Sequence, residues 1–234
     1  MSETSSRISP WLARLVYPLG SKLVLPTFFN KINITGQENI PDKNPVIVAP
    51  THRSRWDALI VPYAMGRMVS GRDMRFMVSA NEVKGLQGWF IRRMGGFPID
   101  TEKPGVGSLK HSVDLLQDDE MLVIFPEGNI FRDRVTPTSV DRTVHPLKRG
   151  VARIALDVVE ENPDTEVNII PVSLRYSESV PSWGADVWVD IGKPLNAAEY
   201  MKDAESVRRA SISLTKELES KLKEIHETPQ ELLV

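Results

Sequence analysis

Two short runs made up entirely of apolar residues constrain the fold of this chain more than any other feature. Pro45–Ala49 reads PVIVA and Met121–Phe125 reads MLVIF. A strand that is apolar at every position is expected to be covered on both faces, as strands are in parallel sheets with helices packed on either side. Four further segments are candidate strands of the same sheet: Arg75–Ser79, Phe97–Asp100, Val167–Tyr176 and Val187–Ile191.

Helical patterns lie between these candidate strands. We predict helices over Asp57–Met65, Val83–Met94, Val106–Gln117, Leu147–Glu160 and Ala197–Glu227. Such alternation is typical of the α/β class, so we expect a mixed, largely parallel sheet flanked by helices. A chain of 234 residues is long enough to bury one such core. The stretch Arg132–Pro146 has no periodicity, and we predict a long loop there with a functional role.

The segment from Ile8 to Asn33 is rich in large apolar side chains. Two basic residues interrupt it and two prolines are expected to break a helix, which argues against a single spanning helix: Arg14, Lys22, Pro18 and Pro26. No acidic residue occurs between Thr4 and Gln37. An apolar helical segment with only cationic charge suits the interface of an anionic bilayer. We therefore expect residues 1–33 to form a membrane-interface segment and residues 34–234 to form the main domain. The alternative is a helical pair that caps the core, with its basic residues facing water.

The composition excludes several classes of function. Lys and Arg number 29 and Asp and Glu number 31, so the net charge is only −2 and no nucleic-acid partner is expected. Cysteine is absent, which removes disulfide frameworks, thiol nucleophiles, cysteine-bound zinc and iron–sulfur ligation. The residues Met1–Ser6 are polar and include an acidic side chain, so we expect no secretory signal.

Of the four histidines, His52 occupies the position most typical of an active site. It follows PVIVAPT, just beyond the carboxyl end of a predicted buried strand, where α/β proteins bind their ligands. Asp57 follows five residues later, at the start of a predicted helix. If the chain folds this carboxylate back onto the imidazole, the contact fixes the tautomer and leaves the other ring nitrogen as a base. In the alternative interpretation Asp57 only begins the helix and His52 is solvated.

The other histidines are expected to lie elsewhere. His111 falls in a helical pattern and His226 in the charged last helix, so both are predicted at the surface. His145 lies in the long loop. No cluster of metal-ligating residues accompanies His52, so we expect no metal there.

Two further motifs have residues suited to binding an anion. The strand Met121–Phe125 opens into Pro126-Glu127-Gly128-Asn129, where glycine permits close approach of a ligand to backbone N–H groups. An ordinary strand-end turn is the alternative. Arg92 and Arg93 precede a pair of glycines, and guanidinium groups bind phosphate well. Taken alone, this last pattern fits a helix C-cap better.

Taken together, these motifs resemble those of the glycerolipid acyltransferase family, of the 1-acyl-glycerol-3-phosphate (lysophosphatidic acid) acyltransferase type. The family's first motif is a histidine and an aspartate separated by four residues, here His52 and Asp57. Its third motif, Phe-Pro-Glu-Gly, is present unaltered at Phe125–Gly128. Softer similarities follow the family's order between Ile34 and Gly192, at Gly95 to Thr101, Leu147 to Ala152, and Ile169 to Val172.

The sequence departs from the family at two arginines that are associated with the acceptor phosphate. Thr101 stands where the family has an arginine after Ile-Asp, and Ile130 stands where it has the arginine of Thr-Arg-Ser. Nearby cations are candidate substitutes: Arg132, Arg92, Arg93 and Lys103. These departures leave the identity of the acceptor open.

The resemblance implies an enzyme that moves a fatty acyl group from an acyl thioester to the free hydroxyl of 1-acyl-glycerol-3-phosphate in phospholipid biosynthesis. It implies His52 as the general base, held by Asp57, and substrate contacts from five residues: Glu127, Gly128, Arg132, Arg93 and Lys148. No resident cofactor or metal is implied, and the co-substrate is an acyl-CoA or acyl-carrier-protein thioester. The lyso-lipid acceptor implies a peripheral or monotopic enzyme on the cytoplasmic face of a membrane.

Other functions remain open from the sequence. The acceptor is alternatively glycerol-3-phosphate or another lysophospholipid. An acyl ester or thioester hydrolase is a rival of another class, and acceptor-dependent release of thiol would exclude it. A catalytically silent membrane-surface protein is the second rival, and detectable turnover would exclude that one.

Overall fold

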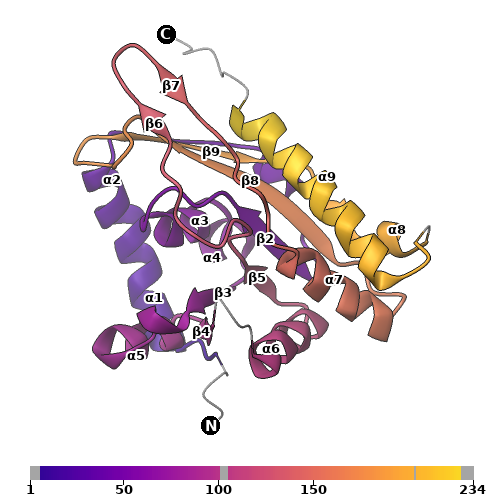
Figure 1. The fold of residues 1–234 in the computed structure, drawn as a ribbon. Helices are drawn as coiled ribbons and strands as arrows, with labels where there is room; N and C mark the ends of the chain where they lie inside the picture. The colour runs from indigo at the N-terminus through magenta and orange to yellow at the C-terminus, as the bar shows by residue number, and fades with distance from the viewer. Residues whose placement is uncertain (1–5, 101–104, 203, 228–234) are drawn as a thin grey trace.

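The computed structural model describes residues 6–100, 105–202 and 204–227. Over these residues its centre is an eight-stranded sheet (Figure 1), made of β1 (Lys31–Thr35), β2 (Val46–Pro50), β3 (Met74–Ser79), β4 (Gly96–Ile99), β5 (Met121–Val123), β8 (Asn168–Tyr176), β9 (Asp186–Ile191) and β10 (Leu195–Asn196). Seven strands follow the order β1-β9-β8-β2-β5-β3-β4, and β10 pairs with β8. Strand β8 runs antiparallel to β9 and β10, and the other pairs are parallel. The expected mixed, largely parallel sheet is therefore confirmed.

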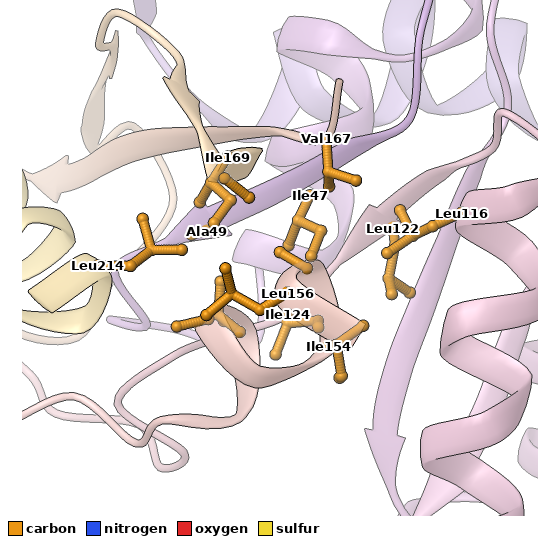
Figure 2. Close-up of a cluster of buried hydrophobic side chains, with 14 of the residues drawn as sticks. Ile47, Ala49, Leu116, Leu122, Ile124, Ile154, Leu156, Val167, Ile169 and Leu214 are labelled. Carbon is orange, nitrogen blue, oxygen red and sulfur yellow. The ribbon is translucent and has the colours of Figure 1, made fainter. Parts of the chain in front are cut away.

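Both faces of the central strand β2 are buried, as the sequence predicts. Ile47 and Ala49 point into a core shared with α6 (Val106–Gln117), α7 (Gly150–Glu161) and α9 (Val207–Glu227), part of which Figure 2 shows. Val46 and Val48 point into a second core on the other face, shared with α2 (Leu25–Phe28) and α3 (Asp57–Met65). Each fully buried valine or isoleucine side chain contributes about 1.5–3 kcal/mol, so a polar residue in its place would be costly.

The predicted helices are present with small shifts at their ends. Helices α3 and α6 span the predicted residues, α5 spans Gly85–Arg93, and α7 begins three residues later than predicted. The predicted last helix is divided into α8 (Ala197–Lys202) and α9. The Ser206 hydroxyl accepts a hydrogen bond from Arg209 N–H at 3.3 Å, as an N-cap serine does, and this starts the second helix. Shorter helical turns lie at η2 (Gln37–Asn39), α4 (Arg67–Ser70) and η3 (Ala80–Glu82).

A continuous helical segment forms the amino-terminal part of the described chain. It consists of α1 (Pro10–Leu19), the π turn η1 (Gly20–Val24) and α2. The predicted breaks at Pro18 and Pro26 are wrong, because the chain stays helical through both. The wider π turn ends at Val24, two residues before Pro26, and makes room for a ring that would clash with the carbonyl group four residues earlier in an ordinary helix.

This amino-terminal helix has one buried and one exposed face. Leu12, Leu25 and the following Phe29 are buried. The opposite face carries a row of exposed apolar side chains at four-residue intervals, which we call the amino-terminal apolar row: Trp11, Leu15, Leu19 and Leu23. The segment therefore caps the core and also presents an apolar surface. None of the helices in the described ranges is long and apolar enough to cross a membrane.

Strand β1 joins this segment to the sheet, and the sequence does not predict it. The strand pairs in parallel with β9, and the boundary expected after residue 33 falls within it. The polar residues Lys31, Asn33 and Thr35 alternate with Ile32 and Ile34, which suits an edge strand with one exposed face.

The predicted loop at residues 132–146 contains a short antiparallel ribbon. Its strands are β6 (Arg134–Val135) and β7 (Val140–Asp141), which extend beyond the sheet in Figure 1. After the ribbon the chain returns along the end of α9, where Val144 N–H donates to Glu227 Oε1 at 3.0 Å. This contact ties the loop to the last helix of the described chain.

Candidate active site

The turn after β2 brings His52 and Asp57 into contact. His52 Nδ1 lies 2.8 Å from Asp57 Oδ2, which is the contact that the spacing suggests. Asp57 is the first residue of α3, where the helix N-terminus favours a carboxylate. Asp57 is fully buried, whereas His52 is partly exposed and lines a cavity. Because Nδ1 is engaged by the carboxylate, Nε2 is the ring nitrogen that a molecule in the cavity can reach.

Three further donors hold the Asp57 carboxylate. The N–H groups of Arg53 and Ser54 donate to Oδ2 at 2.6 and 2.9 Å. The Tyr176 hydroxyl donates to Oδ1 at 2.6 Å. Burial, with the nearby charge of Asp57, raises the pKa of Tyr176 well above its usual value of 10.0, so the phenol stays protonated and remains a donor. A buried carboxylate with this many donors is fixed in place and stays compatible with its charge.

Phe125 restrains the flat face of the His52 ring. The two rings are stacked, with centroids 4.0 Å apart and planes inclined by 21°. Phe125 follows β5, the strand that pairs with β2, so neighbouring parallel strands deliver the two rings to the same edge of the sheet. Asp57 at the ring edge and Phe125 at its face together leave the imidazole little freedom to rotate.

Glu127, for which the sequence motifs imply a substrate contact, is buried and is not among the residues that line the cavity. Its carboxylate is buried and accepts hydrogen bonds from three groups: His52 N–H at 3.0 Å, Arg53 Nη1 at 2.7 Å and His145 N–H at 2.9 Å. A carboxylate without such donors would be strongly destabilised at this depth. Glu127 therefore holds the backbone of His52 in place.

Gly128 and Lys148 line the cavity together. Gly128 has a φ of +79°, and a Cβ atom there would lie 2.6 Å from Lys148 Cε. Only a residue without a side chain lets Lys148 pass so close to the turn. The Gly128 N–H donates to the Phe125 carbonyl at 3.1 Å, so this donor serves the turn and not an anion. The Lys148 side chain brings positive charge to the cavity wall.

The two predicted arginine contacts lie away from the cavity lining. Arg93 is exposed at the end of α5, with its guanidinium carbon 4.9 Å from the centre of the Trp89 ring, as a surface C-terminal arginine would be. Arg132 is also exposed, beyond Phe131, whose N–H donates to the His52 carbonyl at 2.8 Å. Neither is brought to the His52 ring. Thr101 and Lys103 lie outside the described residues.

The cavity has a volume of about 830 Å³ and a largely apolar wall between the sheet and α7. Its apolar lining includes Phe76, Val78, Ile99, Ile124, Val151 and Ile154. The cations among the described lining residues are Lys148 and Arg55, and Arg55 Nη2 pairs with Glu82 at 3.0 Å. An apolar chamber with an imidazole and cationic groups on its wall suits an amphiphile with a hydrocarbon chain and an anionic head.

Sequence reasoning did not find several residues that hold the site. His226 was expected at the surface and is fully buried, and its imidazole lies against Asp133 and Arg53. Arg53 and Asp57 stand beside His52 in the sequence, but Tyr176 is 119 residues from Asp57, and no local pattern marks it. Among the described residues, no group of three or more histidine, cysteine or acidic side chains is placed to hold a metal ion.

The structure is thus an α/β fold with a histidine–aspartate pair on the wall of an apolar cavity. Residues 31–175, more than half of the chain, match the family model described as Acyltransferase, so the chain belongs to the acyltransferase family. The family and the enzyme class suggested by the sequence motifs are thereby confirmed.

Two relatives and one solved structure show which acyltransferases this chain is similar to. The chain is 27% identical over 206 residues to the 1-acyl-sn-glycerol-3-phosphate acyltransferase of Bacillus subtilis (strain 168), covering 83% of this chain and 91% of that protein. It is 33% identical over 167 residues to the protein of the same name from Streptococcus pneumoniae (strain ATCC BAA-255 / R6), covering 69% of this chain and 53% of the relative. The crystal structure of the 1-acyl-sn-glycerophosphate (LPA) acyltransferase PlsC from Thermotoga maritima shares the fold, with a TM-score of 0.63 and 20% identity over 94% of this chain and 81% of that one.

Proposed function

We propose that this protein transfers a fatty acyl group from an acyl thioester to the free hydroxyl of 1-acyl-glycerol-3-phosphate, as a step in phospholipid biosynthesis. The observation that carries the proposal is the 2.8 Å contact between His52 Nδ1 and Asp57 Oδ2 on the wall of an apolar cavity. The proposed identity of the acceptor is taken from the names of the Bacillus and Streptococcus relatives.

His52 Nε2 removes the proton from the acceptor hydroxyl as its oxygen attacks the thioester carbonyl. The new C–O bond forms, the C–S bond breaks, and the proton on His52 passes to the departing thiolate. Asp57 holds the ring and stabilises its positive charge while the proton is on it. General-base assistance of this kind contributes about 10²–10⁴-fold to the rate.

Lys148 binds the phosphate of the acceptor in this proposal. Its side chain crosses Gly128 on the cavity wall, next to the turn that follows Phe125. The family's acceptor arginines are absent at Thr101 and Ile130, so Lys148 carries more of this task here. Glycerol-3-phosphate and other lysophospholipids are the alternative acceptors, since each presents a phosphate and a hydroxyl.

The apolar cavity holds the fatty acyl chain of the thioester. A chain buried there leaves its polar carrier, coenzyme A or an acyl carrier protein, outside the cavity as part of a co-substrate. The chemistry described above needs no resident cofactor, because the proton and the leaving group are handled by His52 and the thioester.

The amino-terminal apolar row supports peripheral binding of the enzyme to a membrane surface, and the cytoplasmic face is the side proposed here. Arg14 and Lys22 lie exposed among the four apolar side chains and suit anionic headgroups. The start of α1 is pinned beside the end of α5, where Ser9 N–H donates to the Arg93 carbonyl at 2.8 Å. Helix α5 adds further exposed apolar side chains: Leu86, Trp89 and Phe90.

The test is acyl transfer by purified protein, with acyl-CoA and acyl-carrier-protein thioesters offered to a panel of lyso-lipids and glycerol-3-phosphate. We expect an acylated product, identified by mass, that forms with the wild-type chain and is lost in His52→Ala. His111→Ala is the matched control, because His111 is a half-buried histidine of α6 that does not line the cavity. Thiol release without an acceptor would instead indicate a hydrolase, and normal turnover in His52→Ala would exclude the mechanism.

A further inference from the structure

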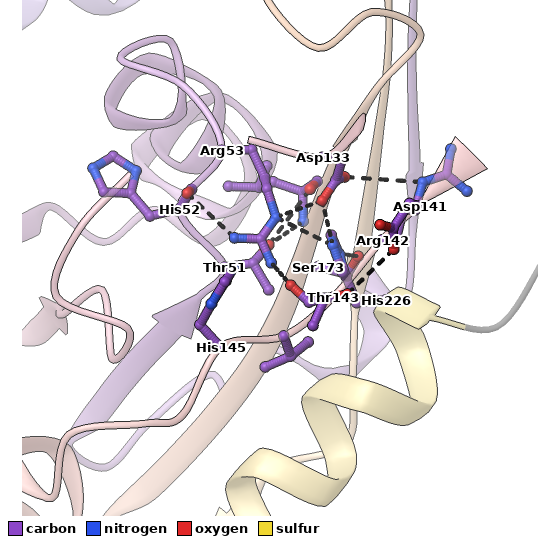
Figure 3. Close-up of polar contacts among 12 residues, drawn as sticks. Thr51, His52, Arg53, Asp133, Asp141, Arg142, Thr143, His145, Ser173 and His226 are labelled. Carbon is purple, nitrogen blue, oxygen red and sulfur yellow. Dashed lines mark hydrogen bonds and ion pairs between the residues drawn. The ribbon is translucent and has the colours of Figure 1, made fainter. Parts of the chain in front are cut away.

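His226 lies in the last turn of α9 and is completely buried. Its Nδ1 lies 2.9 Å from Ser173 Oγ on β8. Its Nε2 lies 3.1 Å from Asp133 Oδ1 and 3.2 Å from Arg53 Nε, and Figure 3 shows these groups converging. Both ring nitrogens are therefore engaged inside the protein, at a point that α9 reaches only with its final turn.

The Arg53 guanidinium is the centre of this cluster. It is buried, its Nη1 donates to Glu127 Oε2 at 2.7 Å, and its Nη2 donates to the Thr143 carbonyl at 3.1 Å. Its Nε lies 3.0 Å from Asp133 Oδ1. A guanidinium is a rigid planar fork of donors, so partners on all its sides fix both its position and its plane.

Arg53 and Glu127 in turn hold the backbone of His52. Glu127 Oε2, which accepts from Arg53, also accepts from His52 N–H at 3.0 Å. Arg53 Nη1 donates to the His52 carbonyl oxygen at 3.3 Å, so both backbone polar groups of His52 are hydrogen-bonded within this cluster. A continuous set of polar contacts thus runs from His226 through Arg53 and Glu127 to the peptide groups of His52.

A neutral imidazole completes this cluster without adding a charge. The cation Arg53 already faces two carboxylates, Glu127 and Asp133, and Arg142 Nε lies 3.9 Å from Asp133 Oδ2. Arg53 Nε–H donates to His226 Nε2 at 3.2 Å, so Nε2 accepts this bond and the ring proton lies on Nδ1, which donates to Ser173 Oγ. Asp133 Oδ1 lies beside both groups and forms an ion pair with Arg53 Nε.

Helix α9 also holds the loop that closes over Glu127. Its Glu227 accepts from Val144 N–H at 3.0 Å, and its Glu219 accepts from Leu147 N–H at 3.4 Å. Between these two points the loop contributes His145 N–H, which donates to Glu127 Oε1. The end of α9 therefore restrains Glu127 from two directions, through Arg53 and through the loop.

We propose that His226 is a positioning residue for the catalytic base, fixing Arg53 and, through Arg53 and Glu127, the backbone of His52. On this view the last turn of α9 belongs to the active site although it touches no substrate. The inference rests on the proposed function in one respect, because it takes His52 as the base.

The test compares the full-length His226→Ala and His226→Gln chains by steady-state kinetics. Glutamine can place its amide oxygen to accept from Arg53 Nε–H, so it preserves the contact that alanine removes. We expect kcat to fall about 10- to 100-fold in His226→Ala, because displacement of a reacting group by about 1 Å has effects of that size. The KM for the acyl thioester should stay within about twofold of wild type, because the cavity is intact, and His226→Gln should recover most of kcat.

Leu222→Ala is the matched control for simple destabilisation of α9. Leu222 is fully buried one turn earlier and packs in the apolar core. All kinetics are measured at a temperature where circular dichroism shows each variant folded, and there Leu222→Ala should keep its kcat. A folded His226→Ala chain with a wild-type kcat would overturn the proposal, and so would equal losses of kcat in His226→Ala and Leu222→Ala.

A second measurement separates failure of this inference from failure of the proposed function. The chain has four histidines, so their ring resonances can be assigned by substitution in NMR spectra. We expect the His52 ring resonances to shift in His226→Ala and to stay in place in Leu222→Ala. If the wild-type chain transfers no acyl group, the proposed function fails, and these resonances still decide the coupling; unmoved His52 resonances in His226→Ala would refute it.

Discussion

The Tyr176 hydroxyl donates a 2.6 Å hydrogen bond to Asp57 Oδ1 from a position 119 residues later in the chain. Asp57 uses its other oxygen for His52 and for the N–H groups of Arg53 and Ser54. The carboxylate thus has one oxygen turned to the base and the other to a buried phenol on β8. The geometry of the candidate base depends on a strand that the sequence places far from it.

Tyr176→Phe removes this hydroxyl and keeps the ring. We expect the free energy of unfolding to fall by about 1.5–3 kcal/mol, the usual worth of a hydrogen bond to a charged group, and kcat to fall severalfold as Asp57 loosens. Urea unfolding and acyl-transfer kinetics measure the two effects. Tyr200→Phe on α8 is the control, since Tyr200 does not line the cavity in the described chain. Unchanged stability and kcat in Tyr176→Phe would contradict the prediction.

Asp57→Asn keeps the size of the side chain and removes its charge. An amide NH₂ in place of Oδ2 would face donors, so the His52 contact, or those of Arg53 and Ser54, must be lost. We expect kcat to fall by about 10²–10⁴-fold, with a smaller change in KM. Transfer assays with saturating thioester measure this loss, and circular dichroism checks the fold. A folded variant with kcat near that of wild type would show that the carboxylate does not support the base.

Gly128→Ala tests the close passage of Lys148 over the turn. The added Cβ would lie 2.6 Å from Lys148 Cε, and the φ of +79° strains any residue other than glycine. We expect a loss of about 1–3 kcal/mol in unfolding free energy and a raised KM for the phosphate-bearing acceptor, because Lys148 is displaced. Gly184→Ala separates the two causes, since it has a φ of +86° but open space around it. Only Gly128→Ala should change KM.

Leu15→Glu and Leu19→Glu place acidic charge in the middle of the amino-terminal apolar row. Both positions are exposed, so we expect little change in stability and weaker binding to vesicles that contain anionic lipid. Flotation with such vesicles measures the binding. Val140→Glu, an exposed apolar site on the β6–β7 ribbon, is the control and should float as wild type does. Deletion of residues 1–33 is the poorer test, because it also removes buried Leu12 and Leu25 from the core.

Stability should decrease as the pH falls below about 6.5. Burial lowers the pKa of His226 and His111 below their usual 6.5; for His226 the charge of Arg53 acts in the same direction, and Asp133 and Glu127 act against it. As the pH falls below 6.5, the unfolded chain therefore binds these protons before the folded chain does. The free energy of unfolding is full above that pH and decreases toward the folded-state pKa values, by about 1.4 kcal/mol per pH unit for each histidine.

Urea unfolding at about pH 7.5 and about pH 5.5 measures this dependence. His226→Gln removes one of the two contributions, so the stability of this variant should change less between the two pH values than that of wild type. An identical change in both chains would show that His226 is not neutral in the folded protein.

Local patterns predicted the parts of the fold that depend on local burial. PVIVA and MLVIF are apolar throughout because β2 and β5 are covered on both faces, and their strands appear where predicted. Strand β1 was missed because KINIT alternates in polarity and acquires its partner β9 only in three dimensions. The breaks expected at Pro18 and Pro26 were wrong because a π turn accommodates the second proline within the helix.

In the candidate site, too, the contacts between residues close in the sequence could be predicted and those between distant residues could not. The contact of His52 with Asp57 spans five residues, so spacing was enough to suggest it. The surroundings of Glu127 could not be inferred, because its three donors come from the turn after β2 and from a loop held by α9. His226 was taken for a surface residue since α9 is rich in charge, yet its contact with Arg53 crosses 173 residues.

The pairing of β1 with β9 has a consequence for how the chain acquires its shape during synthesis. Strand β1 is translated some 150 residues before its partner β9. It cannot form its native pairing until residues 186–191 have left the ribosome. A nascent chain stopped before that point should bind a membrane surface through its first helix and still have an incomplete sheet.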